Sequence, residues 1–465
     1  MNSEQFIREL FDWRGLPVAG REALFERFLH DDNTRRLAKQ LMTDQQILMD
    51  KWRWKNRIAD IQQQALSIPN GTVGKPYETR INTGASGWED VTITGIEGLE
   101  AIGLTYEAAS GIVQGTPQQS GDWPLELSFT VQGAEEEGPQ QKKLLLIVNP
   151  DPRSLWKEKP SDTSDPYWKE DTATAFDRLG DKHIAAASVR GRSHANAGAF
   201  RDDDFAYRFF DDTGWSLVAV ADGAGSAKLA RAGSAIACQS ILEFFSTNLT
   251  RERSDEFSAL LELYAANAEE HQKALSHFVY HLLSQAAYAA HQKLADTAAA
   301  AGAELKDFHT TLIFTLFKKH AAGYAVLSFG VGDCPMALLH TGLQDVTLMN
   351  WLDVGEFGGG TRFITLPEIF SSDKFSTRFR FKLVNDFASL VLMTDGVYDA
   401  KFVVEANLEK IAQWRTFMDD LGGGNEEGIR VALEEDNTEA AAQMARWLGF
   451  WSPGNHDDRT LVLVY

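Results

Sequence analysis

The second half of the chain repeats one local pattern, an apolar run that stops at an aspartate. The runs 215–221, 324–329 and 390–393 are followed by Asp222-Gly223, by a short turn ending in Asp333, and by Thr394-Asp395-Gly396. A run that is apolar at nearly every position is typical of a strand buried on both faces. Aspartates at strand ends can gather at one edge of a sheet, where their oxygens suit Mg²⁺ or Mn²⁺. The pattern predicts a β-rich domain with an aspartate-lined metal site.

Each of these aspartates taken alone is most simply a turn residue, because Asp-Gly is a common turn. The set is more informative. It includes the triple aspartate 202–204 and the pair Asp457-Asp458 before the last apolar run. The sequence has no HExxH zinc pattern and no GxxxxGKS/T phosphate loop, which disfavours a zinc enzyme and a nucleoside triphosphatase of the P-loop kind.

The composition of the chain argues against some classes of binding partner. Lys and Arg number 45 against 66 Asp and Glu, and the net charge of −21 would repel a nucleic-acid backbone. No apolar run is long enough to span a bilayer, and the N-terminus lacks the apolar core of a secretory leader. The two cysteines, Cys238 and Cys334, form no CxxC pair and suit a reducing compartment. We therefore expect a cytoplasmic protein with no nucleic-acid or membrane partner.

The hydrophobic pattern changes along the 465 residues, a length that predicts about three domains. Helical spacing of apolar residues marks a small helical module over 1–66, and Thr43 with Gln46 reads as a capping box that opens a helix there. Short alternating strands predict an all-β module over 67–149. Prolines interrupt regular patterns over 150–181, which reads as a linker before a mixed α and β domain over 182–465.

The stretch GLTYEAASGIVQGTPQQSGDWPLELSFTV within the all-β module resembles immunoglobulin-like modules of bacterial multidomain proteins. The resemblance implies a small β-sandwich. Because the stretch contains no catalytic or metal-ligand cluster, we expect it to act as a spacer or a docking surface.

Six segments of the last domain carry a second resemblance. They are RGRSHANAGAFRDDDFAY, VAVADGAGSAKLARAGS, TTLIFTLF, SFGVGDCPMALL, LVLMTDGVYD and GNHDDRTLVLV. In this order they resemble the motifs of the PPM family of metal-dependent Ser/Thr protein phosphatases, the type 2C class, over about 183–465. The resemblance implies an α+β domain with a central antiparallel β-sandwich flanked by helices, and a site for two divalent cations, Mn²⁺ or Mg²⁺, at one end.

The resemblance also implies which residues bind the cations. Asp203 and Asp222 would be ligands, Gly223 would contribute its carbonyl, and Asp395 and Asp457 would complete the site. Asp202 would contact a cation through water. Asp333 and Asp399 match positions that hold a weaker third metal in some relatives.

Two positions depart from the family pattern. Ala224 stands where many relatives have a histidine that protonates the leaving group, and Pro335 replaces the arginine of a GDSR-like motif. The general acid is therefore unassigned. His194 is a candidate for phosphate binding or proton donation, with a surface or capping role as the equal alternative. Arg190 and Arg192 are candidates for bidentate phosphate contact, with ordinary exposed charges as the alternative.

Together these observations predict a Ser/Thr protein phosphatase in which a hydroxide shared by two cations attacks phosphorus directly, with no covalent intermediate. The alternative is a catalytically weak module that binds phosphoproteins. The partners would be phosphorylated proteins, either targets of a cognate Ser/Thr kinase or a phosphoserine regulator in a bacterial partner-switching circuit. We expect substrate choice to depend on flaps at 358–360 and 400–454.

Overall fold

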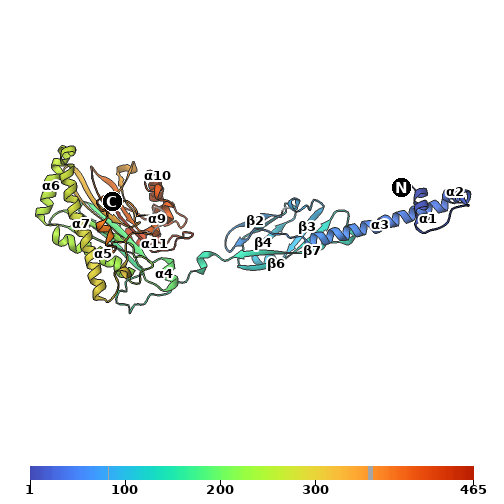
Figure 1. Ribbon diagram of the computed structural model, residues 1–465, viewed down its shortest axis with the longest axis horizontal. Coiled ribbons are helices and arrows are strands. Elements are labelled where there is room, and N and C mark those ends of the chain that lie inside the picture. Colours follow the sequence, from blue (N-terminus) through green and yellow to red (C-terminus); the bar gives the residue numbers. More distant parts are fainter. Residues whose placement is uncertain (82, 354–359) are drawn as a thin grey trace. The chain divides into compact units, whose positions relative to one another are not determined.

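The computed structural model describes residues 1–81, 83–353 and 360–465, which form two compact units (Figure 1). One unit runs from Met1 to Leu155 and the other from Trp156 to Tyr465. Most of the flap predicted at 358–360 lies outside the described residues. None of the helices in the described ranges combines the length and the apolar character that crossing a bilayer requires.

The first unit opens with helices α1 (Ser3–Trp13), α2 (Glu22–His30) and α3 (Asp32–Gln63). The side chain of Asn2 caps α1 and that of Asp31 caps α3. The helix start predicted at Thr43 is wrong, because α3 runs through it without a break and the Thr43 hydroxyl donates to the carbonyl of Lys39 one turn earlier. Where α1 and α2 pack on α3, they share a small core around Leu29.

Two small sheets complete the first unit. Their strand orders are β1 (Gly71–Thr72), β7 (Gln140–Asn149), β6 (Gly121–Val131), β3 (Val91–Glu97), and β2 (Tyr77–Arg80), β5 (Ile112–Gly115), β4 (Leu104–Glu107). Alternate side chains of β6 and β7 are buried, as the sequence alternation predicts, and they share one core with the second sheet and the end of α3. Lys142 on β7 joins the parts, because its Nζ donates to the carbonyls of Ile61, Gln62 and Gln64 at the end of α3.

The second unit is built on two antiparallel sheets. One has the order β10 (Asp204–Phe210), β11 (Trp215–Ala221), β12 (Leu312–His320), β13 (Gly323–Val331), β16 (Phe379–Val384). The other has the order β15 (Val346–Leu348), β14 (Met336–His340), β17 (Phe387–Met393), β18 (Arg459–Val464), β9 (Lys182–Val189), β8 (Thr172–Leu179). Their facing side chains, among them Val218, Leu390 and Val462, form a buried core between the sheets.

Helices cover both outer faces of this sandwich (Figure 1). Helices α5 (Ala230–Asn248), α6 (Arg251–Ala266) and α7 (Ala268–Ala300) share a core with the first sheet. Helices α9 (Asp395–Phe402), α10 (Ile411–Leu421) and α11 (Ala440–Leu448) share one with the second. The predicted antiparallel sandwich flanked by helices is therefore confirmed. Much of 400–454, predicted to be a flap, is this helical layer.

The linker predicted over 150–181 is largely part of the second unit. Residues 172–179 form β8, which pairs with β9 at the edge of its sheet. Lys169 lies deeper, and its Nζ donates to the carbonyl of Asp203 and to the carboxylate of Asp204. The sequence did not reveal β8 for two reasons. The prolines just before it indicate a linker, and an edge strand has too few buried positions to give a clear apolar pattern.

Candidate metal centre

Strand ends from both sheets of the second unit meet at one place. β11 is followed directly by Asp222 and β17 by Thr394-Asp395, while Asp457 lies just before β18 and Asp203 just before β10. Because β10 pairs with β11 and β17 with β18 in antiparallel register, the end of one strand lies beside the start of its partner. The fold therefore carries aspartates from both sheets to the same end of the sandwich.

Asp203 connects the two sheets at this end. Its Oδ2 atom accepts hydrogen bonds from the hydroxyls of Thr394, at 2.7 Å, and Thr460, at 2.8 Å. The backbone N–H of Thr460 in turn donates to the Thr394 hydroxyl. Both hydroxyls bind the same carboxylate oxygen, which fixes the direction in which the buried Asp203 side chain presents the other.

Asp222 is held by two threonines that lie just before β12. The N–H of Asp222 donates to the hydroxyl of Thr311, and its carbonyl accepts from the hydroxyl of Thr310. A Cβ atom at Gly223 would lie 2.7 Å from the carbonyl oxygen of Asp202, closer than packed atoms approach. Only glycine therefore lets this turn bring Asp202 and Asp222 together.

The aspartates of this cluster disfavour one another's charge. Burial, followed by the charge of Asp458, raises the pKa of Asp203 well above its ordinary value, and burial with the charge of Asp395 does the same for Asp222. Burial with the charge of Asp333 raises the pKa of Asp395 to about 7. Loss of contact with water is also the largest cause of the raised pKa values of Asp202, Asp333, Asp399 and Asp457, although the last two residues keep an exposed surface.

This donor set fits divalent cations. Carboxylates buried this close together need compensating positive charge in order to ionise at neutral pH. The donors are oxygens, which suit Mg²⁺ and Mn²⁺ better than softer metals. The charge of Asp333 contributes to the raised pKa values of both Asp395 and Asp399, and its Oδ2 accepts from the Thr361 hydroxyl at 2.6 Å.

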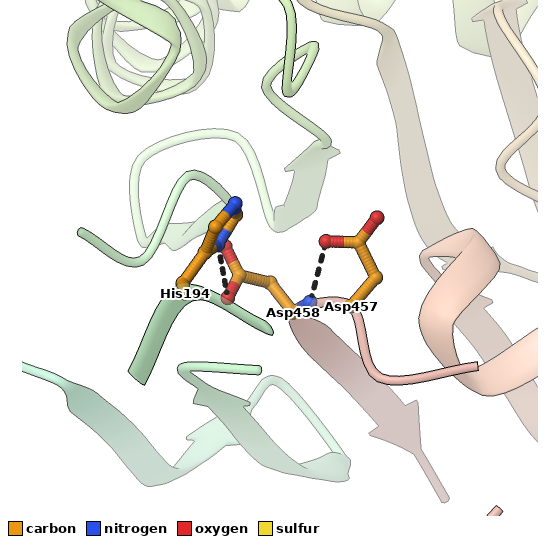
Figure 2. Close-up of side chains that lie close together, drawn as sticks. All are labelled: His194, Asp457 and Asp458. Carbon is orange, nitrogen blue, oxygen red and sulfur yellow. Dashed lines mark hydrogen bonds and ion pairs between the residues drawn. The ribbon is translucent and has the colours of Figure 1, made fainter. Parts of the chain in front are cut away.

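Asp458 is a member of the site that the sequence did not predict. Figure 2 shows it between Asp457, its neighbour in the chain, and His194 from the first motif. Its carboxylate lies 3.0 Å from Nδ1 of His194 and accepts hydrogen bonds from the backbone N–H groups of Gly191 and Asp202. This buried side chain fastens the first motif to the last, and the doubled aspartate was the only signal of it in the sequence.

The surroundings of His194 favour its charged form. Burial lowers the pKa of its imidazole, but the hydrogen bond to Asp458 and the charges of Asp202 and Asp457 outweigh burial and raise that pKa to about 9. Its Nε2 atom lies 3.8 Å from the carboxylate of Asp202. The ligand atoms of His194, Asp457 and Asp458 all lie within 4.8 Å of one another (Figure 2). His194 is therefore part of the carboxylate cluster and not a surface residue.

A family model described as protein phosphatase 2C matches residues 190–449, more than half of the chain. The chain belongs to the protein phosphatase 2C family. The matched range contains every aspartate described above except Asp457 and Asp458, which follow it. A search of curated proteins finds no significant match.

Solved structures similar to this phosphatase 2C chain share little sequence with it. A bacterial serine phosphatase is 13% identical, with 64% of this chain and 97% of that chain covered and a TM-score of 0.32. The catalytic domain of the serine/threonine phosphatase PstP, in complex with two manganese ions, is 16% identical over 60% and 96%, with a TM-score of 0.35. The phosphatase Stp1 from Staphylococcus aureus is 13% identical over 66% and 96%, with a TM-score of 0.31.

The two arginines predicted to bind phosphate are occupied elsewhere in this phosphatase 2C domain. The Arg190 guanidinium is buried, donates to the carbonyls of Ala199 and Lys159 and pairs with Asp171. That of Arg192 donates to the carbonyls of Gly449 and Phe450. Both side chains hold loops together, and their contact with phosphate stays a prediction.

Proposed function

We propose that this protein is a metal-dependent Ser/Thr protein phosphatase that hydrolyses phosphoserine and phosphothreonine in other proteins. One observation carries the proposal: the family's fold gathers carboxylates, most of them buried or half-buried, that raise one another's pKa values in a donor set made of oxygens. A domain that only bound phosphoproteins would have no use for repelling negative charges at a site meant for an anion. The intact aspartate set therefore favours catalysis over the alternative of a binding module.

In this proposal Asp203, Asp222, Asp395 and Asp457 hold two cations, Mn²⁺ or Mg²⁺, with the carbonyl of Gly223 as a further ligand. When bound, two such cations lower the pKa of a water held between them and neutralise charge that develops on the phosphoryl oxygens. Asp333 and Asp399 are the proposed ligands of a weaker third cation.

The other residues of the proposed site position these ligands or contact the phosphoryl group. The Thr394 and Thr460 hydroxyls orient the Asp203 carboxylate. Asp202 acts through water. His194, charged and braced by Asp458, supplies the positive group that the occupied arginines do not, either to bind a phosphoryl oxygen or to protonate the leaving group.

Beyond the catalytic domain, we propose that the β part of the first unit is an immunoglobulin-like docking module and that the protein acts in the cytoplasm. The substrates would be targets of a cognate kinase or a phosphoserine regulator. The net charge of −21 favours phosphosites flanked by basic residues.

The deciding experiment is hydrolysis of p-nitrophenyl phosphate and of a phosphothreonine peptide with Mn²⁺, with Mg²⁺ and with EDTA. Asp395→Asn should abolish turnover. The matched control is Asp211→Asn, an exposed aspartate in the turn at the other end of the β10–β11 pair, and it should behave as wild type. Absence of turnover with every metal, together with phosphopeptide binding, would instead establish the binding module.

A further inference from the structure

Many large apolar side chains of the N-terminal helices are exposed to solvent. On α3 they include Leu37, Leu41, Ile47, Leu48, Met49 and Trp52. Leu48 is 70% exposed and Trp52 is 66% exposed. Soluble proteins seldom expose contiguous apolar surface of this kind unless it binds something.

Most of the exposed residues lie on the middle part of α3, between the two ends of the helix that pack on hydrophobic cores. Its buried residues are Ala38, which contacts the α1–α2 end, and Ile58 and Ile61, which contact the sheets. From Ala38 to Ile58 the helix rises by about 30 Å. No residue between these two is buried, although Met42 and Trp54 pack against the cores at the two ends. An isolated helix of this length is marginal in water, because helices in proteins gain most of their stability from packing an apolar face.

Four of these apolar residues form one stripe, with Ile47 and Met49 to either side of it. At about 100° per residue, Leu37, Leu41, Leu48 and Trp52 lie within roughly 60° of one another around the helix. With Gln45, they follow the alternating spacing of four and three residues that is typical of a coiled-coil seam: Leu41, Gln45, Leu48 and Trp52. We propose that this stripe is a self-association surface, on which α3 of a second copy of the chain packs in antiparallel orientation.

Charge complementarity selects this occupant and this orientation. Asp44 and Lys51 both flank the seam on the same edge, seven residues apart. In an antiparallel pair, Leu41 faces Trp52 of the other copy, and residues on the same edge face each other. Asp44 then lies beside Lys51 of the other copy, twice by symmetry. A parallel pair would place Asp44 beside Met49 and leave both charges without an opposite charge across the seam.

Neighbouring groups are compatible with this contact. Among the described residues, the Lys51 ammonium pairs with Glu136 of its own chain, at 3.5 Å and with both side chains exposed. An exposed pair of this kind contributes little stability, so a contact with Asp44 of the second copy can replace it. A membrane surface is the less favoured occupant, because Asp44 flanks the stripe and a chain of charge −21 is repelled by anionic lipid.

The test is the mass of the full chain in solution, by light scattering and sedimentation at micromolar concentrations. The wild type should have twice the 51.7 kDa mass of one chain. Leu48→Glu with Trp52→Glu should weaken self-association at least 100-fold and give the monomer mass. Leu263→Glu is the matched control, an exposed leucine on α6 of the other unit, and should leave the dimer intact. Circular dichroism checks that each variant is folded.

Charge reversal tests the orientation separately. Asp44→Lys and Lys51→Asp should each weaken the dimer about tenfold, since each converts two symmetric attractions into repulsions. Combining them should restore wild-type association. A wild-type chain that stays monomeric at tens of micromolar, or one that is monomeric and sediments with anionic vesicles, overturns the proposal. A dimer that the double reversal does not restore overturns the antiparallel arrangement.

Discussion

The two compact units each contain an unfavourable arrangement, of charges in one unit and of apolar side chains in the other. The unit from Trp156 to Tyr465 buries carboxylates whose charges disfavour one another. The unit from Met1 to Leu155 does the reverse and leaves large apolar side chains of α3 in water. Each arrangement lowers the stability of the isolated chain, and each is relieved by something added from outside, positive charge in one unit and apolar surface in the other. Function is therefore to be sought where a fold departs from its own most stable arrangement.

The largest effect is expected when one carboxylate of the cluster is removed. Asp222→Asn removes one of the mutually repelling carboxylates, so turnover with Mn²⁺ should fall by roughly 10³-fold. The melting temperature of the metal-free protein should rise, because one source of repulsion is gone. Kinetics and calorimetry in EDTA measure both. A variant that lost activity and also melted lower without metal would show that Asp222 has a structural role instead.

Metal removal is the same test on the wild type. Mn²⁺ at about 100 times its dissociation constant should stabilise the protein by about 2.7 kcal/mol relative to EDTA. The gain should appear only in the transition of the second unit, since the cluster lies there. Differential scanning calorimetry resolves the two transitions, and an equal shift in both would contradict this assignment.

Lys142→Met tests the first unit, where α3 is attached to the sheets. It leaves three carbonyls at the end of α3 without their shared ammonium donor, so we expect the first unit to lose about 3 kcal/mol of stability. Proteolysis near Gln64 should become faster. Hydrolysis of p-nitrophenyl phosphate should not change, because Lys142 belongs to the other unit. A fall in turnover would show that the two units depend on each other.

Arg190→Lys separates loop packing from phosphate binding. Lysine cannot reproduce the donor geometry of the guanidinium toward Ala199 and Lys159, so stability should fall by about 1–2 kcal/mol. The inhibition constant of inorganic phosphate should stay within about twofold of the wild-type value. A large loss of phosphate affinity with unchanged stability would restore the role predicted from the sequence.

The smallest effect concerns His320, which contacts the rings of Trp215 and Phe257. Burial, aided by the charge of Lys318, lowers its pKa to about 4. The unfolded chain, with a pKa near 6.5, binds this proton first, so the stability that neutral His320 allows is complete above about pH 6.5 and is lost as the pH falls toward 4. Between pH 7.5 and pH 5.0, the free energy of unfolding should fall less in His320→Phe than in the wild type. We expect a difference of about 1 kcal/mol, which is reduced because the ring is partly solvated.

The sandwich and its aspartates could be predicted because both depend on local sequence. A run such as 215–221 is apolar at nearly every position, and antiparallel pairing then decides which strand ends meet. The metal roles themselves stay predictions. Residues that hold distant loops together are harder to predict. Arg192, for example, donates to the carbonyls of Gly449 and Phe450, more than 250 residues later in the chain. A loop arginine that binds phosphate and one that binds carbonyls look the same in one sequence.

Domain limits were predictable only where the apolar pattern is strong. The alternation in β6 and β7 marked the all-β part, whereas β8 has few buried positions and was assigned to a linker. The exposed stripe on α3 has the periodicity of a buried helix face. Only the structure shows that nothing within the described residues of the first unit covers it.

The place of β18 in its sheet sets an order of assembly during synthesis. This strand pairs with β17 on one side and with β9 on the other, yet it follows β9 by some 270 residues in the chain. The ribosome must therefore release β18 before the sheet can close, and Asp457, just before it, is the last of the proposed ligands to emerge. The first unit can fold while the rest is still being made. The nascent chain can accordingly dimerise through α3 before it is able to load metal.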